Sequence, residues 1–210
     1  MSEIIDFFLN AYSEASTLDI SLEAIAFVFG IISVVYAKKE NILVYPTGLV
    51  ATIITVYLLY KAGYFGDMMM NFYYSVMSIY GWWNWSRKKE NKYIIPISRT
   101  NLKEKGIGFV LFVLTMMVTY SVYRYYGQEI LIENYIDICT SGVFFTAMWY
   151  MANKKIENWT LWIIADIITV PLYAYRGLGM LSLQYLIFTI LAIQGYLAWK
   201  KTLDKNLSTS

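Results

Sequence analysis

Seven long apolar runs, separated by short polar segments, dominate the pattern of hydrophobic and polar positions along the chain. They cover residues 20–37, 43–60, 64–85, 106–126, 135–153, 159–176 and 180–199. Each is near the roughly 20 residues that a helix needs to cross the hydrocarbon core of a bilayer. Apolar runs of this length are too continuous for the core of a water-soluble domain. The pattern therefore predicts an all-α integral membrane protein with seven transmembrane helices.

Residues 1–19, which precede the first run, mix acidic and apolar side chains. No basic stretch stands before the apolar residues, which argues against a cleaved signal peptide. An amphipathic segment that lies on the membrane surface fits this pattern better. We expect residues 1–19 to be a peripheral N-terminal segment.

Basic residues are distributed unevenly among the polar segments. If the N-terminus lies outside, the inside segments carry all of the 17 lysines and arginines except Lys61, Arg124 and Arg176. Cytoplasmic loops of membrane proteins are enriched in basic residues, so the distribution predicts an N-out, C-in topology. Termini on opposite sides also require an odd number of spans, in agreement with seven.

An internal repeat links the two halves of the chain. A shift of 114 residues, which places residue 51 on residue 165, superimposes Ala51–Leu58 on Ala165–Leu172. The same shift pairs the glycine and tryptophan at 81 and 85 with those at 195 and 199. One offset that matches successive spans indicates two copies of a three-helix unit.

The two copies point in the same direction, because the spans 43–60 and 159–176 both run from inside to outside. Three spans leave the chain on the opposite side of the membrane from where it started. One further helix is therefore needed to bring the second copy parallel to the first. We predict a first three-helix repeat at 20–85, a basic cytoplasmic loop and linker helix at 86–134, a second repeat at 135–200 and a cytoplasmic tail at 201–210. This 3+1+3 arrangement places a binding site between the repeats near the membrane midplane.

One span carries an unusual stripe of side chains. Trp159, Trp162, Asp166 and Tyr173 fall within about 60° of one another on a helix. Tryptophan faces attract a cationic aromatic ring, and a carboxylate one turn further along would neutralise its charge. We predict that this stripe binds substrate. The alternatives are an interfacial anchor for Trp159 and a structural hydrogen bond between helices for Asp166.

The other repeat lacks this chemistry. At the corresponding positions the span 43–60 carries Tyr45, Gly48 and Thr52. A bulky aromatic and acidic stripe that faces a stripe of small residues would leave room for an asymmetric ligand with one flat end. Alternatively, Gly48 only permits close packing of helices.

Further polar residues are placed by their depth in the spans. Gln194 and its repeat mate Tyr80 lie at about the level of Trp162 and are candidate ligands for a ribose or an amide. Asn71 and Gln184 are candidates to line the same cavity nearer its outer half. Each is also compatible with a hydrogen bond that bridges two helices.

Composition excludes several classes of protein. The chain has no histidine and a single cysteine, Cys139, so an internal disulfide and a thiolate or imidazole metal site are excluded. The absence of histidine also removes the commonest general base, and we expect neither an enzyme nor a cofactor. A seven-helix receptor or retinal sensor is an alternative of another class, but the last span has no lysine before Lys200. Neither class explains a parallel repeat.

The repeat arrangement, the motif W-x-x-W-x-x-x-D at 159–166, the Pro171-Leu-Tyr173 that follows and the Gly-Trp-Trp-Asn-Trp at 81–85 together resemble the PnuC-type vitamin transporters. The resemblance covers about residues 20–200. It implies a SWEET-like fold in the bacterial inner membrane, often as a homotrimer, and no partnership with nucleic acid. It also implies facilitated diffusion of a vitamin, typically nicotinamide riboside, which a cytoplasmic kinase then traps by phosphorylation.

One position, residue 166, leaves more than one vitamin possible as the substrate within this family. Many nicotinamide riboside members have asparagine where this chain has Asp166. An aspartate pairs with a cation and accepts hydrogen bonds from an amino group, which fits thiamine at least as well. Family frequency favours nicotinamide riboside, and thiamine or riboflavin is the alternative.

Overall fold

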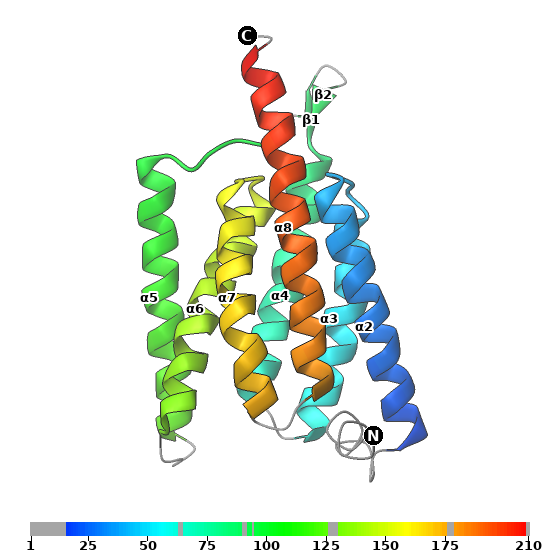
Figure 1. Cartoon of the computed structure of the whole chain (residues 1–210), viewed down its shortest axis with the longest axis vertical. Helices are drawn as coiled ribbons and strands as arrows, with labels where there is room; N and C mark the ends of the chain where they lie inside the picture. Colours follow the sequence, from blue (N-terminus) through cyan, green and yellow to red (C-terminus); the bar gives the residue numbers. More distant parts are fainter. Residues whose placement is uncertain are drawn as a thin grey trace.

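The computed structural model describes residues 16–62, 65–89, 92–93, 95–125, 130–175 and 179–208, and these form a bundle of long helices with roughly parallel axes (Figure 1). The helices are α2 (Thr17–Lys38), α3 (Val44–Ala62), α4 (Phe65–Ser86), α5 (Leu102–Tyr125), α6 (Ile132–Ala152), α7 (Glu157–Tyr175) and α8 (Gly179–Ser208). All seven predicted spans therefore coincide with helices. By length and apolar composition alone, α2, α5, most of α3 and residues 179–205 of α8 are candidates to cross a membrane.

Three details differ from the prediction. The hydroxyl of Ser16 caps α2 by accepting from the Asp19 N–H at 3.2 Å, so the helix begins inside the segment expected to be peripheral. Residues 1–15 of that segment lie outside the described residues. Helix α8 continues to Ser208, through most of the expected tail. The basic loop contains two short antiparallel strands, β1 (Lys88–Lys89) and β2 (Lys92–Tyr93), which the sequence did not predict.

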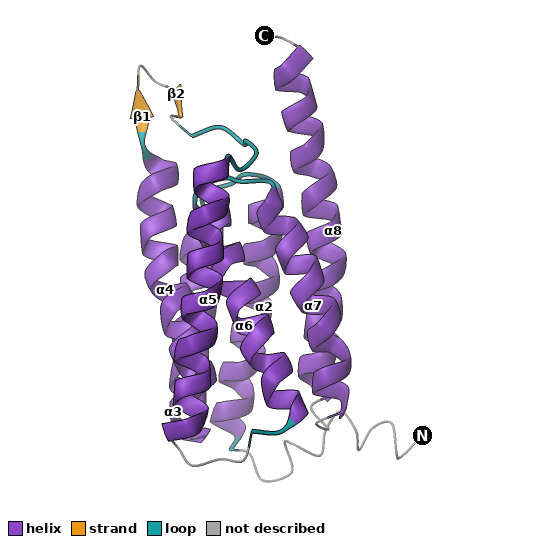
Figure 2. Ribbon diagram, turned by 90° about the vertical axis from the view of Figure 1, so that its left-hand side faces the viewer, coloured by secondary structure: helices purple, strands orange, loops and turns teal. Residues whose placement is uncertain are grey.

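The two ends of the bundle differ in charge. The end that carries the hairpin and the C-terminal part of α8 is called the basic end (Figures 1 and 2). Its basic residues include Lys38 at the end of α2, Arg87 after α4, Lys155 before α7 and Lys200 in α8. The opposite end, where α2 begins, is called the acidic end. The acidic side chains described at this end are Asp19, Glu23, Glu133 and Asp137.

In the first bundle α3 packs on both α2 and α4, and in the second bundle α7 packs on both α6 and α8. The bundles meet where α2 lies against α8 and where α4 lies against α6. Helix α5 packs on α6, hardly touches α4, and stands at the edge of the molecule (Figure 1). This arrangement leaves the space between the bundles as the place for a cavity.

Glycine permits a close aromatic contact within each bundle. A Cβ atom at Gly81 would overlap the ring of Tyr45, and one at Gly195 would lie 2.6 Å from Cη2 of Trp159. Both distances are below any that a side chain tolerates, so glycine is required for α4 to approach α3 and for α8 to approach α7.

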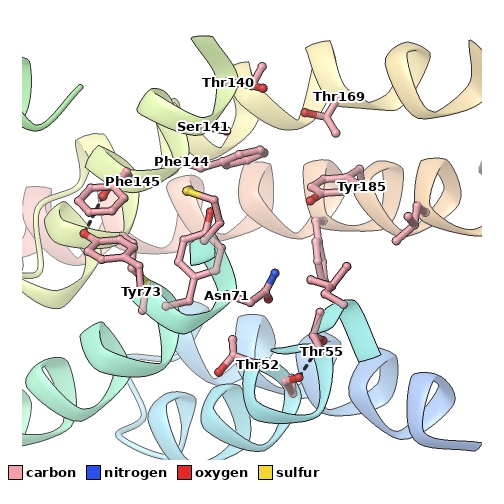
Figure 3. A pocket seen from close by; sticks show the side chains of 18 of the residues that line it. Thr52, Thr55, Asn71, Tyr73, Thr140, Ser141, Phe144, Phe145, Thr169 and Tyr185 are labelled. Atoms are coloured by element: carbon pink, nitrogen blue, oxygen red, sulfur yellow. Dashed lines mark hydrogen bonds between the residues drawn. The ribbon is translucent and has the colours of Figure 1, made fainter. Parts of the chain in front are cut away.

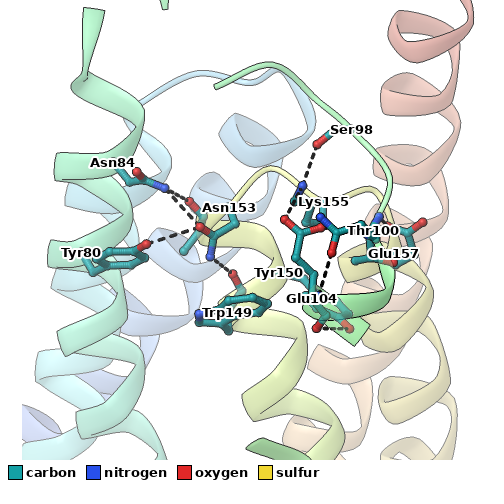
Figure 4. A network of polar contacts seen from close by, with 12 residues as sticks. Tyr80, Asn84, Ser98, Thr100, Glu104, Trp149, Tyr150, Asn153, Lys155 and Glu157 are labelled. Carbon is teal, nitrogen blue, oxygen red and sulfur yellow. Dashed lines mark hydrogen bonds and ion pairs between the residues drawn. The ribbon is translucent and has the colours of Figure 1, made fainter. Parts of the chain in front are cut away.

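A segment at residues 95–101, called the strap, ties the loop before α5 to the second bundle. The Ser98 N–H donates to the Lys154 carbonyl at 3.1 Å, and the Ile156 N–H donates to the Ser98 carbonyl at 3.0 Å. Lys155 Nζ adds an ion pair with Glu104 at 2.7 Å (Figure 4). The turn between α6 and α7 is thereby held by backbone and side-chain contacts together.

Candidate functional site

A cavity of about 2000 Å³ lies between the two bundles and extends beside α5. Side chains from the first bundle form one wall and side chains from α6, α7 and α8 form the other (Figure 3). Of the eight predicted site residues, six line this cavity, namely Asn71, Trp159, Trp162, Asp166, Tyr173 and Gln184. The structure therefore gathers on one cavity residues that are more than 100 positions apart in the chain.

Asp166 is the acidic residue that α7 contributes to the cavity wall. Its side chain is 2% exposed, and its Oδ1 atom has no hydrogen-bond partner in the described part of the chain. A buried carboxylate oxygen without a partner destabilises the protein by several kcal/mol in a medium without water. A polar or cationic ligand in the cavity would supply the missing partner.

Aromatic rings lie around Trp162, which is one turn of α7 away from Asp166. The ring of Trp162 lies 5.4 Å from Phe144 and 6.1 Å from Tyr74. Tyr185 lies 5.9 Å from Phe144 and stacks on Tyr173 at 5.3 Å. These rings form an aromatic wall that suits a flat ring with delocalised positive charge.

The opposite wall, on α3 and α4, includes a group of small polar side chains. Thr52, Thr55 and Asn71 face the aromatic wall across the cavity (Figure 3). The Thr55 hydroxyl donates to the Ala51 carbonyl at 2.8 Å, and Thr52 accepts from the Ser75 hydroxyl at 2.8 Å. Hydroxyl oxygens keep further acceptor capacity after donating, so this wall can accept hydrogen bonds from a ligand that carries hydroxyl groups.

Trp159 lies closer to the basic end of the bundle than the rest of the stripe. It is 2% exposed, with its ring over Gly195 and edge-on to Trp199 at 5.5 Å. The same arrangement holds for Tyr45 in the first bundle, whose ring lies 5.1 Å from Trp85. Trp159 and Tyr45 close one end of the cavity, and we expect their rings to act mainly in packing.

The structure does not bring Tyr80 and Gln194 into the cavity. The Tyr80 hydroxyl donates to Oδ1 of Asn153 at 3.3 Å (Figure 4). Lys38 Nζ donates to Oε1 of Gln194 at 2.9 Å. Tyr80 thus joins α4 to the end of α6, and Gln194 joins α8 to α2. Both side chains bridge the two bundles at the basic end, and neither lines the cavity.

Phe144 and Tyr185 are site residues that the sequence reasoning missed. The offset of 114 pairs them with Gly30 and Asn71 of the first bundle, just as it pairs Trp162 with Gly48. In both pairs one repeat carries a glycine or an asparagine where the other carries an aromatic residue, and this contrast is the sequence signal for the two rings.

The mouth of the cavity lies at the acidic end. Its lining includes Glu23, Glu133 and Asp137, together with Asp19, which forms an ion pair with Lys61 at 2.6 Å. Such a rim favours approach of cations. Within the described residues no group of three histidine, cysteine, aspartate or glutamate side chains is placed to hold a metal ion.

Known proteins match this chain over most of its length. The model of the nicotinamide mononucleotide transporter family matches residues 20–201. The nicotinamide riboside transporter PnuC of Escherichia coli (strain K12) is 24% identical over 201 residues, which cover 85% of this chain and 84% of that protein. The nicotinamide riboside transporter PnuC of Neisseria mucosa is 26% identical over 197 residues, which cover 88% and 74%.

A solved structure has the same fold. The crystal structure of the vitamin B3 transporter PnuC is similar with a TM-score of 0.71 at 22% sequence identity, over 96% of this chain and 90% of that chain. The resemblance drawn from the tryptophan and aspartate motif is thereby confirmed. The chain belongs to the nicotinamide mononucleotide transporter family and is a membrane transport protein, not an enzyme.

Proposed function

We propose that this protein takes up nicotinamide riboside across the bacterial inner membrane by facilitated diffusion. The observation that carries the proposal is the unpartnered Oδ1 of Asp166 beside the aromatic wall of a large cavity. The relatives named as nicotinamide riboside transporters support the same substrate.

The walls fit the two ends of this molecule. The positively charged pyridinium ring would lie against Trp162 and Phe144, with Asp166 as its counter-ion. The ribose hydroxyls would donate to Thr52 and Asn71 on the opposite wall. An aromatic wall and a hydroxyl-bearing wall thus orient the nucleoside across the gap between the bundles.

Charge favours the nucleoside over its phosphorylated form. In the lining drawn from the described residues, Lys61 is the basic side chain, and it lies at the mouth in its ion pair with Asp19. A phosphate group deeper in the cavity would approach Asp166 without a cation to balance it. We therefore expect nicotinamide mononucleotide to bind more weakly than nicotinamide riboside.

We infer that the two bundles are parallel repeats of one three-helix unit in a SWEET-like 3+1+3 arrangement, with α5 as the linker. Support comes from the glycine contacts under Tyr45 and Trp159, which recur at the same offset of 114. The basic end is placed in the cytoplasm by the positive-inside rule, so the cavity opens to the outside. We also propose that the protein assembles as a homotrimer and that a cytoplasmic kinase traps the imported vitamin by phosphorylation.

The test is a titration of the purified protein with nicotinamide riboside, thiamine, riboflavin and nicotinamide mononucleotide, by calorimetry or by quenching of tryptophan fluorescence. We expect nicotinamide riboside to bind tightest and the mononucleotide at least roughly tenfold more weakly, because a buried charge is left unpaired. Tightest binding of thiamine would favour the second candidate, which the carboxylate of Asp166 supports. Binding of none of the four would refute a vitamin transporter.

A further inference from the structure

The cavity stops short of the basic end. Its deepest lining residues are Ala37, Tyr45, Met151 and Trp159, which together are called the floor. Between the floor and the basic end lie buried side chains that do not line the cavity, namely Trp85, Ile97, Ala152, Ile156, Trp199 and Leu203. The structure is therefore closed at the basic end.

The closed end is made of contacts between the two bundles. The Trp199 indole N–H donates to the Ala37 carbonyl at 3.0 Å, across α8 and α2. The Trp85 indole N–H donates to the Ala152 carbonyl at 3.2 Å, across α4 and α6. A ligand in the cavity can reach the basic end only after these contacts separate.

An ion pair between Glu40 and Lys154 also joins the two bundles at this end. Lys154 Nζ lies 3.3 Å from Oε2 of Glu40 and 4.6 Å from the centre of the Trp85 ring, and the lysine is 6% exposed. Both residues have a left-handed backbone, with φ of 53° at Glu40 and 52° at Lys154. They are 114 positions apart, which is the offset of the repeat. The pair therefore joins equivalent turns, each of which follows the first helix of its bundle.

The strap fixes one partner of this pair in the second bundle. Ser98 exchanges backbone hydrogen bonds with Lys154 and Ile156, and Lys155 pairs with Glu104 of α5, which packs on α6. Glu40 follows α2 in the first bundle. Separation of the bundles at the basic end would pull Glu40 away from a lysine that the strap retains.

We propose that Glu40 and Lys154 form a lock that keeps the transporter closed toward the cytoplasm and that opens for each release of substrate. The proposal rests on the proposed transport function and on its orientation. A buried ammonium group requires its counter-charge, so loss of Glu40 favours the conformation in which the bundles part and water reaches Lys154. Loss of Lys154 removes the attraction that holds Glu40, and with it the first bundle, against the second bundle. Substrate crossing then requires that the lock breaks and re-forms in each cycle.

The experiment measures access to the cavity from each side of the membrane. A reporter cysteine replaces Ser141, which lines the cavity, in the full-length protein with Cys139→Ser. Its rate of reaction with a small, charged, membrane-impermeant methanethiosulfonate is measured in right-side-out and inside-out vesicles. With the lock intact we expect fast reaction from the outside and slow reaction from the cytoplasmic side.

Lys154→Gln is expected to raise the cytoplasmic rate roughly fivefold, as loss of one partly buried ion pair would. Glu40→Gln, at the more exposed partner, should do the same and serves if Lys154→Gln folds poorly. Lys103→Gln is the matched control, because it removes the same charge from an exposed lysine of α5, a helix that hardly touches the first bundle, and its rate should stay unchanged. The double exchange of Glu40→Lys with Lys154→Glu should react more slowly than either single reversal.

Equal cytoplasmic rates in Lys154→Gln, Glu40→Gln and Lys103→Gln would overturn the lock, and so would a double exchange that reacts as fast as the single reversals. Fast cytoplasmic reaction with the lock intact would overturn the orientation on which it rests. The assay contains no substrate. If no vitamin binds but the cytoplasmic rates change as expected, the substrate is refuted and the lock stands. If a vitamin binds but the rates do not change, the lock alone is refuted.

Discussion

Asp166 is the only acidic residue among the buried polar side chains of α7 that the structure describes. It is nearly inaccessible, yet Oδ1 has no partner in the described structure. A carboxylate that served the fold would be satisfied by a neighbouring helix, because an unsatisfied one is destabilising. Its position in the cavity wall supports the proposal that a ligand supplies the missing partner.

Asp166→Asn is expected to weaken the binding of thiamine more than that of nicotinamide riboside, because an amide retains a hydrogen-bond acceptor but loses the charge that pairs with an amino group and a cation. Asp166→Ala should weaken both by roughly tenfold or more, as loss of a charge-assisted hydrogen bond does. Titration of both ligands against the purified variants measures this. Asp137→Asn is the control, since its carboxylate lies at the mouth beside Tyr123.

The same variants separate a ligand role from a structural one. If Asp166 awaits a ligand, Asp166→Asn should leave the thermal midpoint of the empty protein unchanged or raise it, because a buried charge without a partner is removed. A structural hydrogen bond would instead make the midpoint fall. Equal losses of affinity for both vitamins together with a lower midpoint would show that Asp166 holds the fold.

At the scale of elements, the approach of α8 to α7 depends on the absence of a side chain at Gly195. The Trp159 ring occupies the space that a Cβ atom would need, and Trp159 itself packs edge-on to Trp199. Neither ring can move freely, because both are buried in the cluster that closes the basic end. The contact is therefore rigid in both partners.

Gly195→Ala is expected to destabilise the protein by about 1–3 kcal/mol through overpacking. The matched control is Gly106→Ala in α5, where a Cβ atom meets nothing within 4 Å. There the better helix propensity of alanine should stabilise by up to about 1 kcal/mol. Thermal unfolding in detergent, followed by circular dichroism, measures both, and equal midpoints for the two variants would contradict the packing argument.

At the scale of the whole molecule, one cavity is open at the acidic end and closed at the basic end by contacts between two bundles. Asp166 is the acid deep in its wall, and the other acids of the lining lie at the mouth. A chain of carboxylates that could carry protons between the ends is not found among the described residues. We therefore expect no coupling of transport to a proton gradient.

Proteoliposomes that contain the purified protein should equilibrate nicotinamide riboside to equal concentrations on both sides, and dissipation of the proton gradient should not change the rate of uptake. An enclosed kinase with ATP should then drive accumulation beyond equality, because phosphorylation removes the transported form from the equilibrium. Uptake of labelled vitamin measures both effects. Accumulation above the external concentration without the kinase would show that transport is coupled to an ion.

Much of the architecture follows from local pattern. The seven helices lie where the apolar runs predicted them, because backbone groups in lipid must be satisfied within each helix and the length of a span is therefore set by the bilayer. The offset of 114 and the tryptophan and aspartate motif identified the family. The continuation of α8 to Ser208 was not predicted, because a polar helix outside the membrane has no apolar run to mark it.

The membership of the site was only partly predictable. Trp162 and Asp166 were found because a large aromatic residue and an acid are conspicuous in an apolar helix. The structure alone decided that Tyr80 bonds to Asn153 and Gln194 to Lys38, outside the cavity. Depth in the membrane can be counted along a helix, whereas the direction of a side chain depends on how the helices are rotated against one another.

The sequence by itself therefore determined the class of protein, the number of helices, the family and the acid in the middle of the W-x-x-W-x-x-x-D span. Only the tertiary structure decided which end of the cavity is closed and that Glu40 and Lys154 meet there. These two residues are 114 positions apart in loops without any hydrophobic pattern. Their contact depends on the packing of α2 against α8 and of α4 against α6, which no local signal in the chain encodes.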